Sequence, residues 1–237
     1  MTDIPPGELR VIPVRSIGEI RPGDDLPRIL SGATELEDQD VLVVTQKVVS
    51  KAEGQIIEID QEDPRGHKAV VEAESARILR RRGDLIISET RHGFVCANAG
   101  VDLSNVEDGF AAILPVDSDR SARRIRDVIR AEQDVEIGVL VTDTFGRPWR
   151  KGVTDVAIGS AGISPILDLR GTNDALGREL AVTEVAIVDE IAGAADLVMG
   201  KSAGYPAAIV RGIPPSWFKG GSISADIIRS PHDDLFR

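Results

Sequence analysis

The sequence predicts a mixed α and β (α+β) protein, and three observations support this prediction. Two apolar runs of strand length, Asp40–Thr45 and Val135–Val141, are rich in branched residues, as strands covered on both faces usually are. Two longer segments, Asp117–Gln133 and Thr183–Met199, place apolar residues at helical spacing. No internal repeat or low-complexity tract divides the 237 residues, so we expect one domain, residues 1–237, with interleaved lobes.

In the N-terminal half, Asp24 or Asp25 follows the turn at Pro22-Gly23 and is placed to cap a helix that begins at Leu26. Residues 69–82 also have helical spacing, and Gly83 is placed to end that helix. The basic run at residues 80–82 would then lie at the negative end of the helix dipole. Apolar runs predict strands at residues 8–14, 40–45, 55–59 and 84–88.

In the C-terminal half, Asp117 or Ser118 is placed to cap the first helix, while Thr183 is placed to cap the second and Gly200 to end it. Residues 152–164 are small and apolar, which lets two backbones, or a backbone and a ligand, approach closely. They lack the GxGxxG and Walker spacings, so neither a dinucleotide fold nor a P-loop is supported. A further strand is predicted at residues 207–211.

The charge balance of 28 basic and 39 acidic residues gives a formal net charge of −11 at pH 7. Such a field repels nucleic acids and anionic membranes, so neither is expected as a partner, and an anionic substrate needs a local basic site. The N-terminus has no signal-peptide pattern, and no apolar stretch approaches the roughly 18 to 20 residues that span a bilayer. We therefore expect a soluble, cytoplasmic protein.

The side chains available to bind a metal ion are mainly oxygen donors. A single cysteine, Cys96, excludes an internal disulfide and a cysteine-rich zinc site, and the three histidines are scattered. Oxygen donors favour magnesium, manganese or calcium over zinc or copper.

The segment from Val141 to Gly152 gathers the most chemistry. Directly after a predicted buried strand it holds a carboxylate, Asp143, two hydroxyls, Thr142 and Thr144, and three cations, Arg147, Arg150 and Lys151. Carboxylate and hydroxyl oxygens suit a hard metal ion, and the cations suit the phosphates or carboxylates that such an ion would bridge. We predict a loop with a metal-assisted site for an anionic ligand; the alternative is a loop whose charges form surface ion pairs.

Two other groups fit the same chemistry. Lys47 and Lys51 follow the other buried strand and, four residues apart on a helical turn, could reach one phosphate; otherwise they are solvated surface lysines. Asp102 and Asp143, from separate strands, could share one or two metal ions. Alternatively, Asp102 is a turn residue that bonds its own backbone.

Six blocks of the sequence together resemble the coenzyme F420:L-glutamate ligase family, whose members add glutamates to the coenzyme F420 precursor. They occur in the family's order and span nearly the whole chain: residues 21–26, 43–51, 99–105, 141–150, 182–192 and 234–236. The resemblance implies an F420 ligase-like fold, an intertwined homodimer and a GTP-dependent amide ligation that joins L-glutamate to the precursor. It also implies Mn²⁺ or Mg²⁺, and further K⁺, as the ions.

The resemblance implies that Asp102, Asp143 and Thr144 are the metal ligands. It implies guanine nucleotide contacts at Ile17, Gly18, Glu19, Ile20, Gln46, Lys51, Asn105, Met199, Gly200, Lys201, Ser202, Ala203, Gly204, Tyr205 and Pro206. From charge and position alone, we expect Arg147, Arg150 and Lys151 to hold the acidic groups of the substrate as catalytic residues.

One residue departs from the family pattern. In archaeal members a glutamine ligates a second metal where this chain has Lys201, and an ammonium group cannot ligate a metal. Either the second metal is held differently, or Lys201 itself neutralises phosphate. Some bacterial relatives carry an additional flavin-binding reductase-like domain; none follows in these 237 residues, so we expect no reductase activity.

Two rival functions use the same sites. A metal-dependent nucleotide phosphohydrolase would use the two aspartates with water as the nucleophile. A GTP-binding sensor would bind through Lys51 and Asn105 without turnover. The breadth of the family resemblance favours the ligase.

Overall fold

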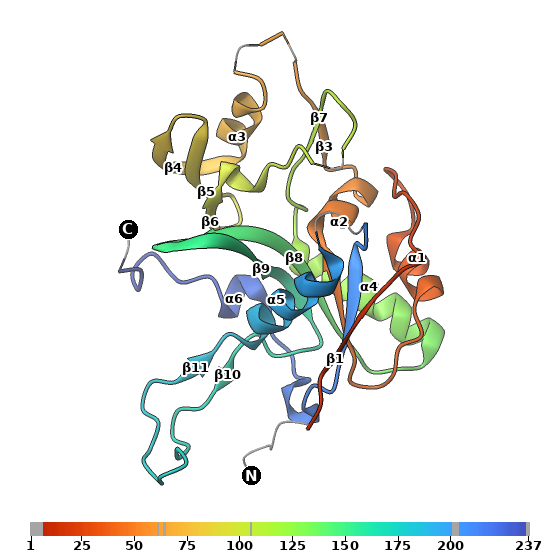
Figure 1. The fold of residues 1–237 in the computed structure, drawn as a ribbon, viewed down its shortest axis with the longest axis vertical. Helices are drawn as coiled ribbons and strands as arrows, with labels where there is room; N and C mark the ends of the chain where they lie inside the picture. The colour runs from red at the N-terminus through yellow and green to blue at the C-terminus, as the bar shows by residue number, and fades with distance from the viewer. Residues whose placement is uncertain (1–6, 61, 64, 105, 201–203, 236–237) are drawn as a thin grey trace.

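The computed structural model describes residues 7–60, 62–63, 65–104, 106–200 and 204–235. A five-stranded sheet forms its centre, in the order β1-β12-β2-β8-β9 (Figure 1). β2 and β8 run parallel, and the other neighbouring strands run antiparallel. The five strands are β1 Arg10–Pro13, β12 Ala207–Arg211, β2 Val41–Thr45, β8 Gly138–Arg147 and β9 Arg150–Ala161. Together with the helices, this sheet confirms the predicted mixed α and β fold.

Helices cover both faces of the sheet (Figure 1). On one face pack α1 (Leu26–Ala33), α2 (Gln46–Ala52) and α4 (Ser118–Gln133). On the other pack α5 (Ile187–Met199) and the short α6 (Ile223–Asp226). The chain passes directly from β2 into α2, so the end of this central strand is also the start of a helix.

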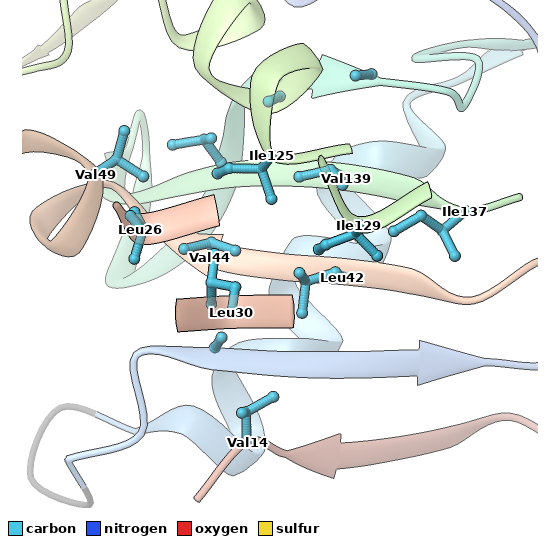
Figure 2. Packing of buried hydrophobic residues seen from close by; sticks show 14 of the residues in the cluster. Val14, Leu26, Leu30, Leu42, Val44, Val49, Ile125, Ile129, Ile137 and Val139 are labelled. Atoms are coloured by element: carbon cyan, nitrogen blue, oxygen red, sulfur yellow. The ribbon is translucent and has the colours of Figure 1, made fainter. Parts of the chain in front are cut away.

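Strand β2 contributes to both cores because its side chains alternate between the two faces. Leu42 and Val44 point toward Leu30 of α1 and Ile129 of α4, as Figure 2 shows. Val41 and Val43 join the core beneath α5 instead. All four valine and leucine side chains are fully buried, which confirms the prediction of a strand covered on both faces.

The small residues of β9 allow α4 to approach the sheet closely. A Cβ atom added to Gly159 would lie 2.3 Å from the backbone carbonyl of Ser118, in the first turn of α4. Only glycine fits at this contact, which confirms the predicted close approach of two backbones.

Smaller elements surround the central sheet (Figure 1). α3 (Lys68–Glu74) packs with a three-stranded sheet of β4 (Ser75–Arg82), β5 (Leu85–Thr90) and β6 (Val95–Ala97). β3 (Ile56–Glu58) pairs with β7 (Phe110–Ala112), and β10 (Leu167–Asp168) pairs with β11 (Glu184–Val185). Single turns of 3-10 helix occur at Asn98–Gly100 and Pro215–Trp217.

The prediction of one helix over residues 69–82 is wrong in its second half. The helix ends at Glu74, and Ser75–Arg82 forms strand β4, which pairs with β5 through a tight turn where Gly83 has a φ of +59°. Ile78 packs against the small core of Val71 and Ile86. Pairing with β5 therefore overrides the local helical spacing, and the three arginines lie on a strand rather than at a helix end.

The prediction of a loop at residues 142–152 is also wrong. β8 continues to Arg147 and β9 begins at Arg150, so this segment is a long antiparallel hairpin. Likewise, α5 begins at Ile187 rather than near Thr183, because Glu184 and Val185 pair with β10. Cross-strand hydrogen bonds, absent from any local sequence window, decide both cases.

The predicted helix ends have mixed outcomes. Asp117 caps α4 by accepting a hydrogen bond from the Arg120 N–H, and Gly200 ends α5, as predicted. Asp25 occupies the N-cap position of α1, but its side chain makes no capping hydrogen bond.

Asp119 joins the C-terminal segment to the sheet. Its buried carboxylate accepts hydrogen bonds from the backbone N–H groups of Ser160 and Ile223, each at 2.9 Å, and of Ser224 at 3.1 Å. Asp119→Ala would leave three N–H groups without this acceptor. We therefore expect the free energy of unfolding, measured in urea, to fall by on the order of 3 kcal/mol. The exposed Asp127 on the same helix provides the control: Asp127→Ala should change stability by less than about 0.5 kcal/mol. Equal stabilities for the two variants would contradict this role of Asp119.

Candidate functional site

A cavity of about 400 Å³ opens at the carboxyl end of β2, where the parallel pairing with β8 ends at Thr45 and Thr142 and β8 continues beyond it. Sites in sheets of this kind commonly form outside the carboxyl ends of parallel strands. The lining residues come from five parts of the chain: Ile17–Ile20, Thr45–Val48 with Lys51, Thr142–Thr144 with Asp155, Asp196 with Met199–Gly200, and Gly204–Pro206.

Strand β8 presents different side chains on its two faces within this cavity. Val139 and Val141 face the core of α1 and α4, and Leu140 faces the core of α5. The same alternation places Asp143 on the α4 side and both Thr142 and Thr144 on the α5 side. Asp143 and Thr144, predicted together as metal ligands, are therefore adjacent in sequence but on opposite faces of the strand.

Asp102 is not among the residues that line the cavity, but it pairs with Lys47 of α2, which is. The Lys47 Nζ lies 2.8 Å from Asp102 Oδ2 and 2.5 Å from Ser104 Oγ, and Asp102 Oδ1 accepts the Ser104 N–H at 2.7 Å. Asp102 thus bonds its own local backbone, as the alternative interpretation predicted, and also pairs with a lysine. Burial tends to raise the pKa of Asp102, but the hydrogen bonds from Lys47 and Ser104 outweigh this effect and lower the pKa.

The pKa of Asp143 shifts in the opposite direction to that of Asp102. Burial raises the pKa of Asp143 to about 7, although a hydrogen bond from the Thr144 backbone opposes the shift. The negative charges of Asp102 and Asp155 raise the pKa further. The pKa of this carboxyl group therefore lies close to neutral pH, whereas the pKa of the neighbouring Asp102 is lowered.

On the α5 side, Asp155 of β9 accepts hydrogen bonds from two threonines. Thr144 Oγ1 donates to Asp155 Oδ1 at 2.6 Å, and Thr142 Oγ1 donates to Asp155 Oδ2 at 3.2 Å. Thr144 and Asp155 are directly opposite each other in the hairpin, and Asp155 is only 4% exposed. The sequence analysis missed Asp155; its one signal was a single acid at the start of a small, apolar segment.

α2 brings Gln46, Lys47 and Lys51 to the cavity. The lysine side chains are only 23% and 15% exposed, so they are not the solvated surface pair of the alternative interpretation. Lys51 pairs with Glu19 across the cavity wall. Gln46 is buried and accepts a hydrogen bond from Ser50, but within the described chain its amide nitrogen has no acceptor. A ligand in the cavity could supply that acceptor.

The structure brings together all of the described residues that were predicted to contact a nucleotide. They line the one cavity: Ile17, Gly18, Glu19, Ile20, Gln46, Lys51, Met199, Gly200, Gly204, Tyr205 and Pro206. Asn105, Lys201, Ser202 and Ala203 lie outside the described residues. Asp196, in the last turn of α5, also lines the cavity and was not predicted.

The structure does not bring Arg147, Arg150 and Lys151 into the cavity. They lie at the exposed tip of the β8–β9 hairpin, where Arg147 Nη2 donates to the Lys151 carbonyl at 2.7 Å. Figure 1 shows this hairpin extending away from the central sheet. A long paired hairpin, in place of the expected loop, carries these cations away from Asp143.

The donor set of the cavity suits a hard cation only in part. In the part of the chain that the structure describes, no three acidic, histidine or cysteine side chains gather closely enough to form a complete metal site. However, Mg²⁺ commonly takes one or two protein carboxylates and completes its shell with water and substrate phosphates. Such an ion would neutralise the negative charges of Asp143 and its neighbours Asp102 and Asp155.

None of the described helices is both long and apolar enough to cross a membrane.

Comparison with known proteins shows the family to which the chain belongs. Residues 15–212 match the F420-0:Gamma-glutamyl ligase family. The coenzyme F420:L-glutamate ligase of Methanopyrus kandleri is 46% identical, over 97% of this chain and 98% of the relative. Those of Methanothermobacter thermautotrophicus and Archaeoglobus fulgidus are 41% and 36% identical, each over 97% of this chain and 99% and 96% of the relatives. The chain therefore belongs to the F420-0:gamma-glutamyl ligase family and is a ligase.

Proposed function

We propose that the protein uses GTP to join L-glutamate through an amide bond to the coenzyme F420 precursor, releasing GDP and phosphate. Three things support this proposal: the family, the names of the relatives, and a cavity that gathers the expected nucleotide contacts beside Asp143. The last observation carries the most weight, because these residues come from distant parts of the chain.

The proposed chemistry has two steps. A carboxylate is a poor electrophile, so an oxygen of the precursor's carboxylate first attacks the γ-phosphorus of GTP, and the bond between this phosphorus and GDP breaks. The amine of glutamate then attacks the carbonyl carbon of the acyl phosphate. Phosphate leaves with the carbon–oxygen bonding pair, the nitrogen loses its proton, and the amide remains.

The residues of the cavity supply binding and orientation. Lys47 and Lys51 are placed to bind phosphate oxygens, which would compensate for the overall negative charge of the protein. The amide nitrogen of Gln46 is a donor for the same ligand. To bind phosphate, Lys51 would have to leave its ion pair with Glu19, and Lys47 would have to leave its ion pair with Asp102.

We also propose that Mg²⁺ or Mn²⁺ binds here, with K⁺ as a further ion. Asp102 and Asp143 would hold a cation on one face of β8, and Thr144 would serve a second on the other face. Bound cations would neutralise charge on the phosphates.

Ligation can be tested by following GDP release and product mass with GTP and Mn²⁺, with and without L-glutamate and the F420 precursor. We expect turnover only when both are present, together with the mass gain of one glutamyl unit per amide formed. Hydrolysis of GTP regardless of either would favour a phosphohydrolase, and binding without turnover would favour a sensor; both outcomes contradict the proposal.

Two lysine variants make this test specific to the cavity. Lys51→Ala should weaken GTP binding on the order of tenfold, since a charge-assisted contact contributes about 1.5 kcal/mol. Lys68→Ala removes a lysine that pairs with Asp84 near α3, so GTP binding should not change. Equal titration curves for Lys51→Ala and the parent would remove Lys51 from the proposed site.

The raised pKa of Asp143 predicts a pH-dependent affinity for Mn²⁺. Below pH 7 a cation must displace the proton on this carboxyl group, so the affinity should fall about tenfold per pH unit. Above pH 7 the carboxylate is already ionised and the affinity should level off. Titrations of the substrate-free protein with Mn²⁺ from pH 5.5 to 8.5 would measure this curve. A flat profile would contradict a metal at Asp143.

Asp143→Asn serves as the control for this profile. Because the folded-state pKa is raised from 3.8 to about 7, Asp143 holds a proton in the folded chain but not in the unfolded chain between these pH values, so the stability of the metal-free fold falls as the pH rises through them. Asp143→Asn should therefore raise the melting temperature in EDTA at pH 8 but not at pH 4. The same variant should lose the pH-dependent part of Mn²⁺ binding.

We further propose that the protein forms a homodimer. Large apolar side chains are exposed on the two hairpins, with Trp149 83% and Val153 58% exposed on β8–β9, and Leu176 81% and Val182 84% exposed near β10–β11. Exposed apolar groups of this kind commonly mark an interface. Light scattering should give about twice 25.4 kDa, and Trp149→Asp should shift the mass toward the monomer. A monomeric parent protein would refute the dimer.

A further inference from the structure

We propose that Asp155 is a positioning residue, which holds the hydroxyl proton of Thr144 so that the Thr144 oxygen presents its lone pairs to a divalent cation. This inference rests on the metal requirement of the proposed function. It assigns a role to a residue that the resemblance did not mark and that only the fold brings to the cavity.

The geometry of the hairpin carries the inference. Thr144 and Asp155 are paired across β8 and β9, and the register places their side chains on the same face. The distance of 2.6 Å from Thr144 Oγ1 to Asp155 Oδ1 is short for a hydroxyl that donates to a carboxylate, which is typical of a charge-assisted hydrogen bond. Asp155 is 4% exposed, so water competes little for this bond.

The chemistry of a hydroxyl ligand explains why the acceptor matters. A threonine hydroxyl has one proton and two lone pairs, and a cation can be held only by the lone pairs. If the proton rotated toward the cavity, its positive end would repel the ion. A carboxylate behind the hydroxyl fixes the proton away from the ion and increases the negative charge on the oxygen.

Asp155 and Asp102 accept hydrogen bonds from different donors. Thr142 and Thr144 donate to Asp155, whereas Lys47 and Ser104 donate to Asp102. These hydrogen bonds therefore share no donor. Loss of Asp155 should weaken binding of the ion that Thr144 serves, and leave the hydrogen bonds of Asp102 in place.

The test measures Mn²⁺ binding to the substrate-free protein by electron paramagnetic resonance, which counts free ions and needs no turnover. Thr144→Val keeps the shape of the side chain and removes the hydroxyl, and Asp155→Ala removes its acceptor. We expect each variant to raise the Kd of one Mn²⁺ about tenfold, as the loss of outer-shell carboxylates commonly does. Because both act through one hydroxyl, the double variant should bind no more weakly than either single variant.

Two further variants separate positioning from a general loss of structure. Asp155→Asn keeps one acceptor oxygen and should restore part of the affinity. Thr172→Val removes a hydroxyl that also donates at 2.6 Å, but to the Leu169 carbonyl outside the cavity, so Mn²⁺ binding should not change. If Asp155→Ala fails to fold, the same comparison can be made between Asp155→Asn alone and Asp155→Asn combined with Thr144→Val.

The outcomes are distinguishable. Additive effects of Thr144→Val and Asp155→Ala, or normal Mn²⁺ binding by Asp155→Ala, would overturn the positioning role alone. A substrate-free parent protein that binds no Mn²⁺ would overturn this inference, whereas the metal component of the proposed function would be overturned if ligation proceeds in EDTA. The ligation assay would then decide separately whether glutamate is still joined to the precursor.

Discussion

The parallel pairing of β2 with β8 is the constraint on which the rest of this structure depends. It places the carboxyl end of β2 beside the middle of β8, which is distant in sequence, so that Gln46 and Lys47 meet Thr142 and Asp143. Leu42 and Val44 are buried on one face, and Val41 and Val43 on the other. A slip of one residue would exchange these faces, so core packing on both sides fixes the register and, with it, the site.

The site combines carboxylates and lysines in a protein of strongly negative net charge. Hydrogen bonds from Lys47 and Ser104 keep Asp102 ionised, while burial and two neighbouring carboxylates raise the pKa of Asp143 to about 7. The protonation of the cavity carboxylates near neutral pH therefore depends on which group compensates their negative charge. A cation, a proton or a lysine can each provide that compensation, which links metal binding to pH.

The β8–β9 hairpin positions both the acidic residues near the cavity and the basic residues at its tip. Strand alternation separates Asp143 from Thr144, and cross-strand pairing brings Asp155 behind Thr144. The pairing continues to Arg147, with a register shift after Gly146, and carries the basic tip, with the exposed Trp149, away from the cavity. The hairpin thus contributes residues to the cavity lining and also carries exposed apolar side chains near its tip.

The sequence by itself determined the central strands, helix α4, the end of α5 and the identity of most cavity residues, because these depend on local periodicity, caps and motifs. Only the tertiary structure decided that residues 75–82 form a strand, that Asp143 and Thr144 face opposite sides, and that Asp155 lines the cavity beside Thr144. The reason is physical: periodicity reports local burial, whereas β-pairing depends on hydrogen bonds with partners elsewhere in the chain. Asp155 belongs to the site because of its register with Thr144, and register is a property of the folded sheet.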